Sequence, residues 1–155
     1  MRYGTGMVRA ATTLALVLAI TGAGVIAGGA AAQSGDFAYA GASLFGENEQ
    51  GHEGAGKDAM GDFSAEFELK RSRICYLLEV EGLDEVVAAH IHEGNKDQNG
   101  PPVMNLELAG PKGDDICVAI DKELMTKIVR RPENYYVNVH TTAFPDGAVR
   151  GQLGE

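Results

Sequence analysis

The chain has 155 residues with 22 acidic and 13 basic side chains, which gives a formal net charge of −9 at pH 7. This acidic balance excludes nucleic-acid binding through the overall field of the protein. Residues 36–155 have the length of one domain with a single hydrophobic core. The sequence shows no internal repeat and no long linker in this region, so we predict one domain.

The first 32 residues differ in composition from all that follow. Arg2 and Arg9 give a positive start, residues 10–27 are apolar or small, and the closing AAA offers an A-x-A cleavage pattern. This order is typical of an export signal. A retained membrane anchor is the alternative, since the apolar run approaches the length of a spanning helix, but its many small residues favour cleavage. We predict a signal peptide over residues 1–32 and a secreted, extracellular or cell-envelope protein, which contacts a membrane only if this segment is retained.

Cys75 and Cys117 are the two cysteines of the chain, and both lie in strand-like segments after the signal. In an oxidising compartment two such cysteines are expected to form one disulfide. Closing a loop of about 40 residues would stabilise the domain by roughly 3–4 kcal/mol. A cysteine–histidine metal site is the alternative, and export favours the disulfide.

Residues 63–153 contain a series of short segments in which apolar and polar residues alternate. Phe63 and Phe67 alternate with Glu66 and Glu68, which is the period of a half-buried strand. Polar, glycine-rich segments typical of turns separate these strands. We predict an all-β fold, either a β-sandwich or a small Greek-key barrel. The predicted strands are FSAEFELK, RICYLLEVEGL, VVAAHIH, VMNLEL, ICVAI, YYVNVHT and GAVRGQL.

One segment, residues 121–132, breaks the strand pattern. Asp121 is a suitable N-cap for a helix, and Pro132 is a suitable stop. The apolar residues between them recur at helical spacing: Leu124, Met125, Ile128 and Val129. We predict one short helix, whose apolar stripe packs against the domain rather than against a partner.

Two of the four histidines, His90 and His92, stand one residue apart in the segment AAHIHEG. Alternate residues of a strand share a face, so the two imidazoles are predicted to project together. Val87, Ala89 and Ile91 are then predicted to point into the core.

A third histidine, His140, lies on the more polar face of the predicted strand YYVNVHT. If the two strands are neighbours, His90, His92 and His140 converge and can bind copper or zinc, both of which accept neutral imidazole. The alternative is that the three side chains hold the turns EGNKDQNGPP and FPDG by hydrogen bonds. Spacing alone leaves both interpretations open.

The fourth histidine, His52, lies in the loop-like segment ENEQGHEG, in which Glu49 also lies. We name both side chains as candidate additional metal ligands, because a loop can complete a site built on strands. A solvated loop histidine is the simpler interpretation of His52.

Several segments together resemble the CHRD domain, which is named for chordin and found in many bacterial exported proteins. They are LFGENE, CYLLEVEGL, AAHIHEG, NGPPVMNL and YYVNVHTTAFPDGAVRGQL, the last being the most specific. The resemblance runs from about Phe37 to Leu153, although the loop after Glu49 reads QGHEG where the family usually has an apolar or proline pair. The family is defined by its sequence pattern rather than by an activity. The resemblance therefore implies an exported, bacterial binding or structural module whose partner is an unknown extracellular protein or surface.

The chain also shows a more distant similarity to copper–zinc superoxide dismutases. It rests on the order of three features along the sequence: H-x-H, then V-x-V-H, then an arginine near the C-terminus. The similarity implies a Greek-key β-barrel, with an immunoglobulin-like sandwich as the alternative. It also implies that His90, His92 and His140 stand where three copper ligands stand, and Arg150 where an anion-guiding arginine stands. The long zinc loop with its bridging histidine is missing after His92.

Two functional hypotheses of different classes follow from these observations. The first is a non-enzymatic exported module that binds a partner or surface, with or without copper or zinc on the three histidines. In this hypothesis Arg150 is structural and bonds the turn after His92 through Glu93 or a backbone carbonyl. The second is a copper-dependent redox enzyme, in which Arg150 attracts an anionic substrate to an open metal position. We favour the first hypothesis.

Overall fold

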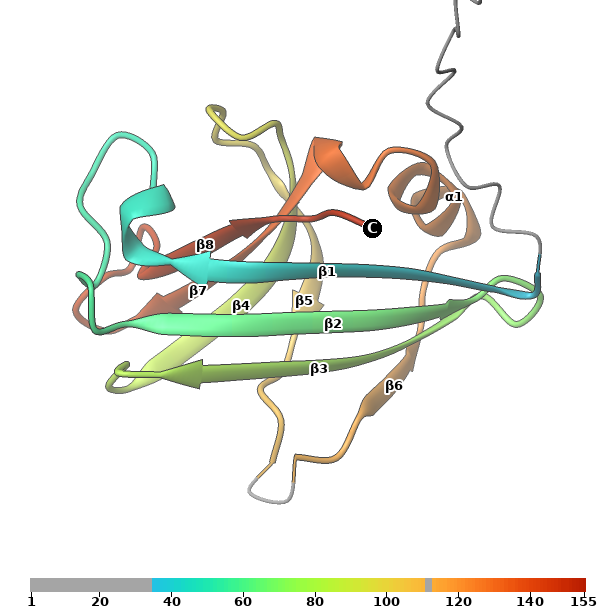
Figure 1. The fold of residues 1–155 in the computed structure, drawn as a ribbon, viewed down its shortest axis with the longest axis horizontal. Coiled ribbons are helices and arrows are strands. Elements are labelled where there is room, and N and C mark those ends of the chain that lie inside the picture. Colours follow the sequence, from blue (N-terminus) through green and yellow to red (C-terminus); the bar gives the residue numbers. More distant parts are fainter. Residues whose placement is uncertain (1–34, 111–112) are drawn as a thin grey trace, which may run out of the picture. The chain divides into compact units, whose positions relative to one another are not determined.

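The structure is a computed structural model that describes residues 35–110 and 113–155. The predicted signal peptide over residues 1–32 lies outside the described residues. Within them, eight strands form one antiparallel sheet in the order β5-β4-β7-β8-β1-β2-β3-β6 (Figure 1). The elements are β1 Phe37–Phe45, η1 Gly46–Asn48, β2 Met60–Glu68, β3 Arg73–Glu81, β4 Val86–Glu93, β5 Pro102–Leu106, β6 Ile116–Ala119, α1 Lys122–Arg130, η2 Pro132–Asn134, β7 Tyr135–Thr141 and β8 Val149–Gln152.

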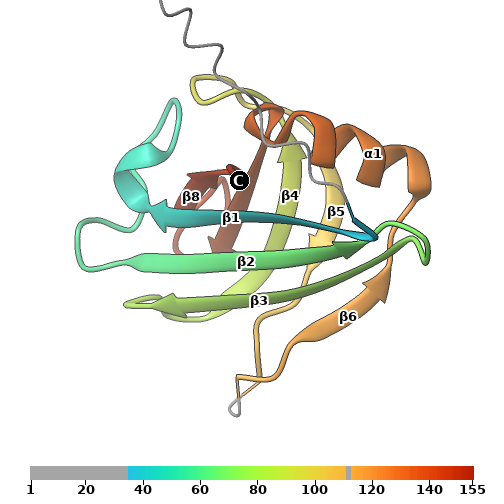
Figure 2. The ribbon, with the colours of Figure 1, turned by 45° about the vertical axis from the view of Figure 1, so that its right-hand side comes forward.

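The sheet curls so that its two halves face each other. β1, β2 and β3 form one half and β4, β5 and β7 the other, and the strands of the two halves cross steeply (Figures 1 and 2). β8 joins the halves, because it pairs with both β7 and β1. β6 follows β5 in the chain yet pairs with β3 in the opposite half, a crossover typical of Greek-key folds. The prediction of an all-β fold of Greek-key type with one short helix is confirmed.

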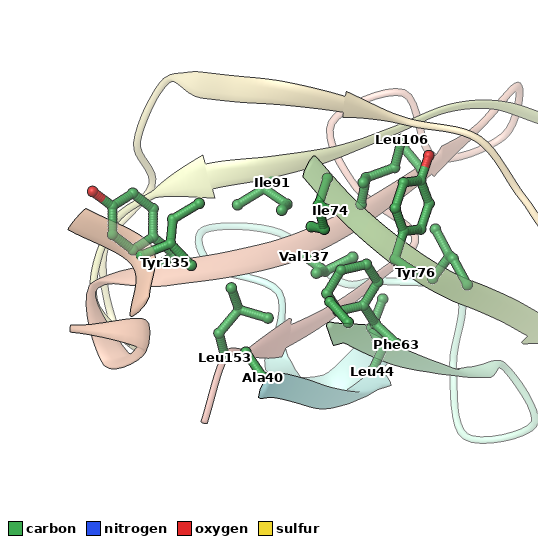
Figure 3. Close-up of a cluster of buried hydrophobic side chains, with 14 of the residues drawn as sticks. Ala40, Leu44, Phe63, Ile74, Tyr76, Ile91, Leu106, Tyr135, Val137 and Leu153 are labelled. Carbon is green, nitrogen blue, oxygen red and sulfur yellow. The ribbon is translucent and has the colours of Figure 1, made fainter. Parts of the chain in front are cut away.

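Apolar side chains from both halves meet in the core (Figure 3). Phe63 and Phe67 of β2 and Ile74, Tyr76 and Leu78 of β3 are buried, as the period-two pattern predicts. Residues of the opposite half face them: Ile91, Leu106, Val137 and Val139. Burial of a side chain of this kind contributes roughly 1.5–3 kcal/mol, so the core holds the two halves of the sheet together.

The sequence pattern misses β1 and misplaces Val87. The inward residues Ala38 and Ala40 of β1 are small, so the strand lacks the alternation of large apolar residues that marks its neighbours. Val87 is 62% exposed rather than buried in the core. The pairing of β4 with β7 is irregular between Val86 and Ala88, and an irregularity of this kind turns a side chain toward the other face.

The helix α1 begins at a side-chain cap. Asp121 accepts hydrogen bonds of 3.0 and 2.9 Å from the N–H groups of Glu123 and Leu124. Met125 and Ile128 are buried against the core, which confirms the predicted helix and its packing role. Within residues 35–110 and 113–155, no helix has both the length and the apolar character needed to cross a membrane.

Replacing Asp121 with alanine is expected to lower the free energy of unfolding by about 1 kcal/mol, because two backbone N–H groups lose their acceptor. Urea unfolding followed by circular dichroism measures the difference. Asp121→Asn keeps the side-chain oxygen and is expected to retain most of the stability. Equal losses in the two variants would show that the charge at the helix start, rather than the cap, is what stabilises α1.

Cys75 on β3 and Cys117 on β6 form the predicted disulfide. The two residues stand directly opposite each other in the antiparallel pair, with their Cα atoms 4.0 Å apart. Cys75 is half-buried and Cys117 is exposed, so the bond lies outside the core. It ties the short strand β6 to β3, as is common in domains that fold in an oxidising compartment.

Candidate metal centre

β4 and β7 are neighbours in the sheet, and this brings the three histidines together. In the antiparallel register His140 lies opposite Ala88, and His90 lies opposite Asn138. Because side chains alternate along a strand, His90, His92 and His140 share the outer face of the sheet, while the residues between them point into the core. The pairing on which the predicted convergence depends is present.

The three imidazoles form one cluster. Their ring centroids are 5.1 Å apart for His90 and His140, 5.4 Å for His90 and His92, and 6.0 Å for His92 and His140. One ring nitrogen of each histidine lies within 4.8 Å of the other two, and no other such group occurs in the described part of the chain. Two nitrogens that share one metal ion at bonds of about 2.0–2.1 Å lie no more than about 4 Å apart. A small inward movement of the rings would therefore give the spacing that a metal requires.

Two loop carbonyls decide which nitrogen carries the proton in His92 and in His140. Nδ1 of His92 donates to the carbonyl oxygen of Gly100 at 2.9 Å, and Nδ1 of His140 donates to that of Pro145 at 3.0 Å. A carbonyl oxygen can only accept, so the proton lies on Nδ1 in both rings and Nε2 keeps its lone pair. These two histidines bond the turns, as one interpretation of the sequence proposes, and the lone pair of Nε2 in each ring stays available to a metal ion.

One nitrogen of each ring is buried without a hydrogen-bond partner among the described residues: His90 Nδ1, His92 Nε2 and His140 Nε2. Buried polar atoms are nearly always paired, and leaving one unpaired costs roughly 1–3 kcal/mol. Three unpaired nitrogens in one cluster are atoms that a single metal ion would satisfy. The residues present therefore fit copper or zinc.

Burial lowers the pKa of both His92 and His140 below the ordinary value of 6.5. Proximity to His90 adds to the lowering in each case, and the hydrogen bonds to the loop carbonyls oppose it. Both rings are therefore neutral at pH 7, the form that binds a metal ion.

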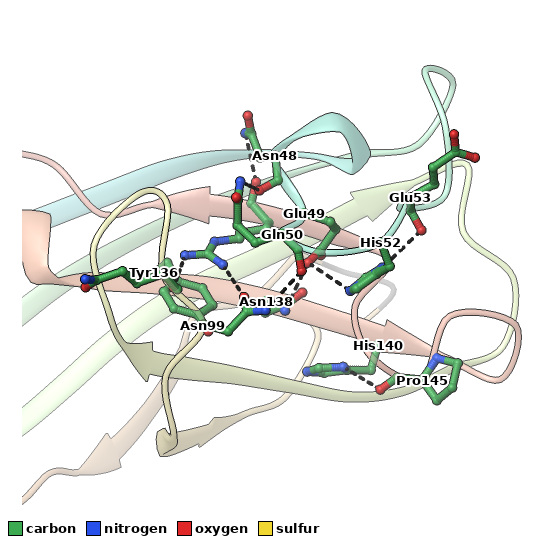
Figure 4. A network of polar contacts seen from close by, with 12 residues as sticks. Asn48, Glu49, Gln50, His52, Glu53, Asn99, Tyr136, Asn138, His140 and Pro145 are labelled. Atoms are coloured by element: carbon green, nitrogen blue, oxygen red, sulfur yellow. Dashed lines mark hydrogen bonds and ion pairs between the residues drawn. The ribbon is translucent and has the colours of Figure 1, made fainter.

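A polar network lies beside the cluster on the outer face of β7 and β8 (Figure 4). Arg150 is 1% exposed. Its guanidinium donates to Asn99 Oδ1 at 2.8 Å and to the carbonyl oxygens of Asn95 and Gln98 at 3.0 and 2.7 Å. It also lies 3.5 Å from the centre of the Tyr136 ring. Arg150 therefore fixes the turn over residues 95–99 largely through backbone carbonyls.

Tyr136 links this network to the histidines. Its ring stacks on His92, with centroids 4.8 Å apart and an interplanar angle of 13°. Its hydroxyl accepts a hydrogen bond of 3.1 Å from the N–H of Gly100. This positioning role was not predicted from the sequence. The period-two pattern of β7 places Tyr136 on the same face as His140 and could have pointed to it.

Glu49 and His52, the two candidate additional ligands, pair with each other beside the cluster. His52 Nε2 lies 3.8 Å from Glu49 Oε2, and Asn138 Nδ2 donates to the same oxygen at 3.5 Å. The side chain of Glu49 is 1% exposed and that of His52 is 30% exposed. Burial raises the pKa of Glu49 from its ordinary 4.5 to about 7, against the lowering effect of His52, Arg150 and Asn138.

Gly147 makes room for the buried carboxylate of Glu49. A Cβ at this position would lie 2.5 and 2.6 Å from the two Glu49 oxygens. Gly147 also has a φ of +142°, which side chains rarely tolerate. The FPDG turn therefore needs glycine at its end both for its backbone and for its contact with Glu49.

The strands and loops that build this centre lie in a region shared with known sequences. A family model for the CHRD domain matches residues 40–153. The chain belongs to the CHRD domain family. No curated protein and no solved structure matches the chain. Membership makes this CHRD domain a module of extracellular type, and its likeness to superoxide dismutases stays a hypothesis.

Proposed function

We propose that this CHRD domain is a non-enzymatic, exported binding module that holds one copper or zinc ion through His90, His92 and His140. One observation carries the proposal: ring nitrogens of the three histidines lie within 4.8 Å of one another, and one nitrogen of each ring is buried without a hydrogen-bond partner among the described residues. Neutral imidazole is a good ligand for both metals. The net charge of −9 favours retention of a cation.

The surroundings of the three histidines support the proposal. In metal sites a ligating histidine usually donates its other N–H to a carbonyl or carboxylate, which fixes the ring and its tautomer. His92 and His140 donate in this way to Gly100 and Pro145. Tyr136 stacks on His92 and restricts its rotation further. Two of the three rings are thus held in place by protein contacts alone.

The copper redox alternative receives less support from the position of Arg150. An arginine that attracts an anionic substrate needs an exposed guanidinium. Arg150 is buried, and its guanidinium donates to three oxygen atoms of the 95–99 turn. We therefore propose that the metal supports binding to an extracellular protein or surface rather than a redox reaction.

Titration of the metal-free chain with copper and with zinc tests the proposal. We expect one ion per chain for at least one of the two metals. At a free metal concentration 100 times Kd, the free energy of unfolding is expected to rise by about 2.7 kcal/mol. His90→Ala removes a proposed ligand that makes no hydrogen bond to a turn. We expect it to weaken metal binding by at least about 100-fold, because loss of a residue that only hydrogen-bonds a ligand already weakens binding by up to about that much.

His52→Ala is the matched control, because His52 lies outside the cluster and is the fourth histidine of the chain. Its affinity for metal is expected to stay close to that of the wild type. Absence of stoichiometric copper and zinc binding would contradict the proposal. So would an equal loss of affinity in His52→Ala and His90→Ala. Superoxide turnover by the copper-loaded chain would favour the redox alternative.

A further inference from the structure

An asparagine followed by glycine lies in the turn that covers the histidine cluster. Asn99 is exposed, and its side-chain amide makes two different hydrogen bonds. Its Oδ1 accepts from Arg150 at 2.8 Å, and its Nδ2 donates to the carbonyl oxygen of Gln50 at 3.0 Å. The amide therefore joins the 95–99 turn both to β8 and to the loop after η1.

Contacts in the fold favour both residues of this pair. A Cβ at position 100 would overlap the carbonyl oxygen of Glu93, so Gly100 cannot be replaced without a backbone shift. An aspartate at position 99 could accept from Arg150 but could not donate to Gln50. Hydrogen bonds favour the amide at position 99, and the close backbone contact requires glycine at position 100. Their position next to each other makes a reaction between the two residues possible.

We propose that Asn99 is a site of spontaneous covalent modification by intramolecular deamidation. With no side chain on Gly100, its backbone nitrogen can approach the Asn99 side-chain carbonyl carbon. A C–N bond forms there, the bond to the amide nitrogen breaks, and ammonia leaves with the proton of the Gly100 N–H. Water then adds to either carbonyl of the cyclic succinimide. The product is aspartate, or isoaspartate when the main chain is left running through the former side chain.

Arg150 favours the first step, because its N–H points at the oxygen on which negative charge develops during the attack. The hydrogen bond from the Gly100 N–H to the Tyr136 hydroxyl places an acceptor at the proton that leaves. Among the asparagines of the chain, Asn99 alone is followed by glycine. Modification is therefore expected to concentrate at this residue.

The position of Gly100 gives the modification a consequence for the histidine cluster, and this part rests on the proposed metal function. The Gly100 carbonyl accepts the Nδ1 proton of His92 at 2.9 Å. Isoaspartate at position 99 lengthens the main chain by one carbon directly before Gly100, so the carbonyl moves and His92 loses its support. Aspartate leaves the main chain unchanged and removes only the hydrogen bond to Gln50.

Ageing of the purified full chain under mildly alkaline conditions, followed by peptide mapping with mass spectrometry, tests the modification. We expect Asn99 to convert to aspartate and isoaspartate several-fold faster than Asn95, which lies in the same turn but precedes Lys96. Asn99→Gln should show no conversion at this position. Conversion of Asn99 no faster than that of Asn95 would overturn the proposal.

Metal titration of the separated products tests the consequence. The isoaspartate form is expected to bind copper or zinc at least several-fold more weakly than the fresh chain, whereas Asn99→Asp binds like the fresh chain. Equal affinities of the isoaspartate form and the fresh chain would overturn the link to His92. Failure of the fresh chain to bind metal would contradict the proposed function alone, because the mass change is measured without metal.

Discussion

Replacement of both cysteines with alanine is expected to lower the free energy of unfolding by about 4 kcal/mol. The bond between Cys75 and Cys117 spans 42 residues of the chain, and without it the unfolded chain regains the freedom that the cross-link removes. Cys117 is exposed and Cys75 is half-buried on the outer face, so alanine leaves no cavity in the core. The expected loss therefore measures the cross-link rather than packing.

Urea unfolding of Cys75→Ala/Cys117→Ala beside the oxidised wild type measures this loss. Wild-type chain treated with a thiol reductant is the matched control, since it keeps both side chains, and it is expected to lose a similar amount. A decrease in the free energy of unfolding of less than about 1 kcal/mol in both samples would contradict the expectation. The disulfide would then stabilise the domain little more than an ordinary surface contact does. The enclosed segment carries His90 and His92, so the result also shows how strongly their strand depends on an oxidising compartment.

The strands that could be predicted from sequence are those with large residues on the buried face. β2 and β3 place phenylalanine, isoleucine, tyrosine and leucine on the buried face, which is formed by every second residue, with mostly polar residues between them, so their period can be recognised in the sequence. β1 buries Ala38 and Ala40 instead, and its exposed residues include Tyr39, so the contrast between its two faces is weak. Val87 shows a second reason why the sequence-based prediction fails. The irregular register of β4 and β7 changes the face on which Val87 lies, and no sequence pattern indicates this irregularity.

The candidate site was predictable only in part. The spacing of His90 and His92 is enough to place them on one face of a strand. Their meeting with His140 depends on the pairing of β4 with β7, two strands that are separated in the chain by β5, β6 and α1. In His92 and His140, the nitrogen that stays free for the cluster depends on the loop carbonyls of Gly100 and Pro145, whose positions follow from the folded turns.

The two interpretations that the sequence left open for the histidines are compatible in the structure. A turn-holding histidine uses Nδ1, and a metal-binding one can use Nε2 of the same ring. In His92 and His140, Nδ1 bonds a turn carbonyl and Nε2 is buried without a hydrogen-bond partner among the described residues. His90 bonds neither the Gly100 nor the Pro145 turn among the described residues. Its replacement therefore tests metal binding without disturbing a turn.

Replacing Glu49 with glutamine is expected to stabilise the metal-free domain at alkaline pH by on the order of 2–3 kcal/mol. The Glu49 side chain is 1% exposed, and burial raises its pKa from 4.5 to about 7. Between these two values the unfolded chain releases the proton while the folded chain keeps it. Stability from this group is therefore lost as pH rises from 4.5 to 7, and the full penalty for a buried charge persists above 7.

Glutamine has nearly the same shape as glutamate and carries no charge at any pH, so it removes this penalty. Urea unfolding of Glu49→Gln and wild type at about pH 4 and about pH 8 measures the effect, and the two proteins are expected to differ much less at the acidic pH.

Comparison of the two proteins at each pH cancels the contributions of His92 and His140, whose lowered pKa values act in the opposite direction. Their stabilising contribution is complete above pH 6.5 and is lost as the pH falls below it. A difference between variant and wild type that stays constant from acidic to alkaline pH would contradict a buried, proton-holding Glu49. It would mean that the folded protein stabilises the Glu49 carboxylate as fully as water does.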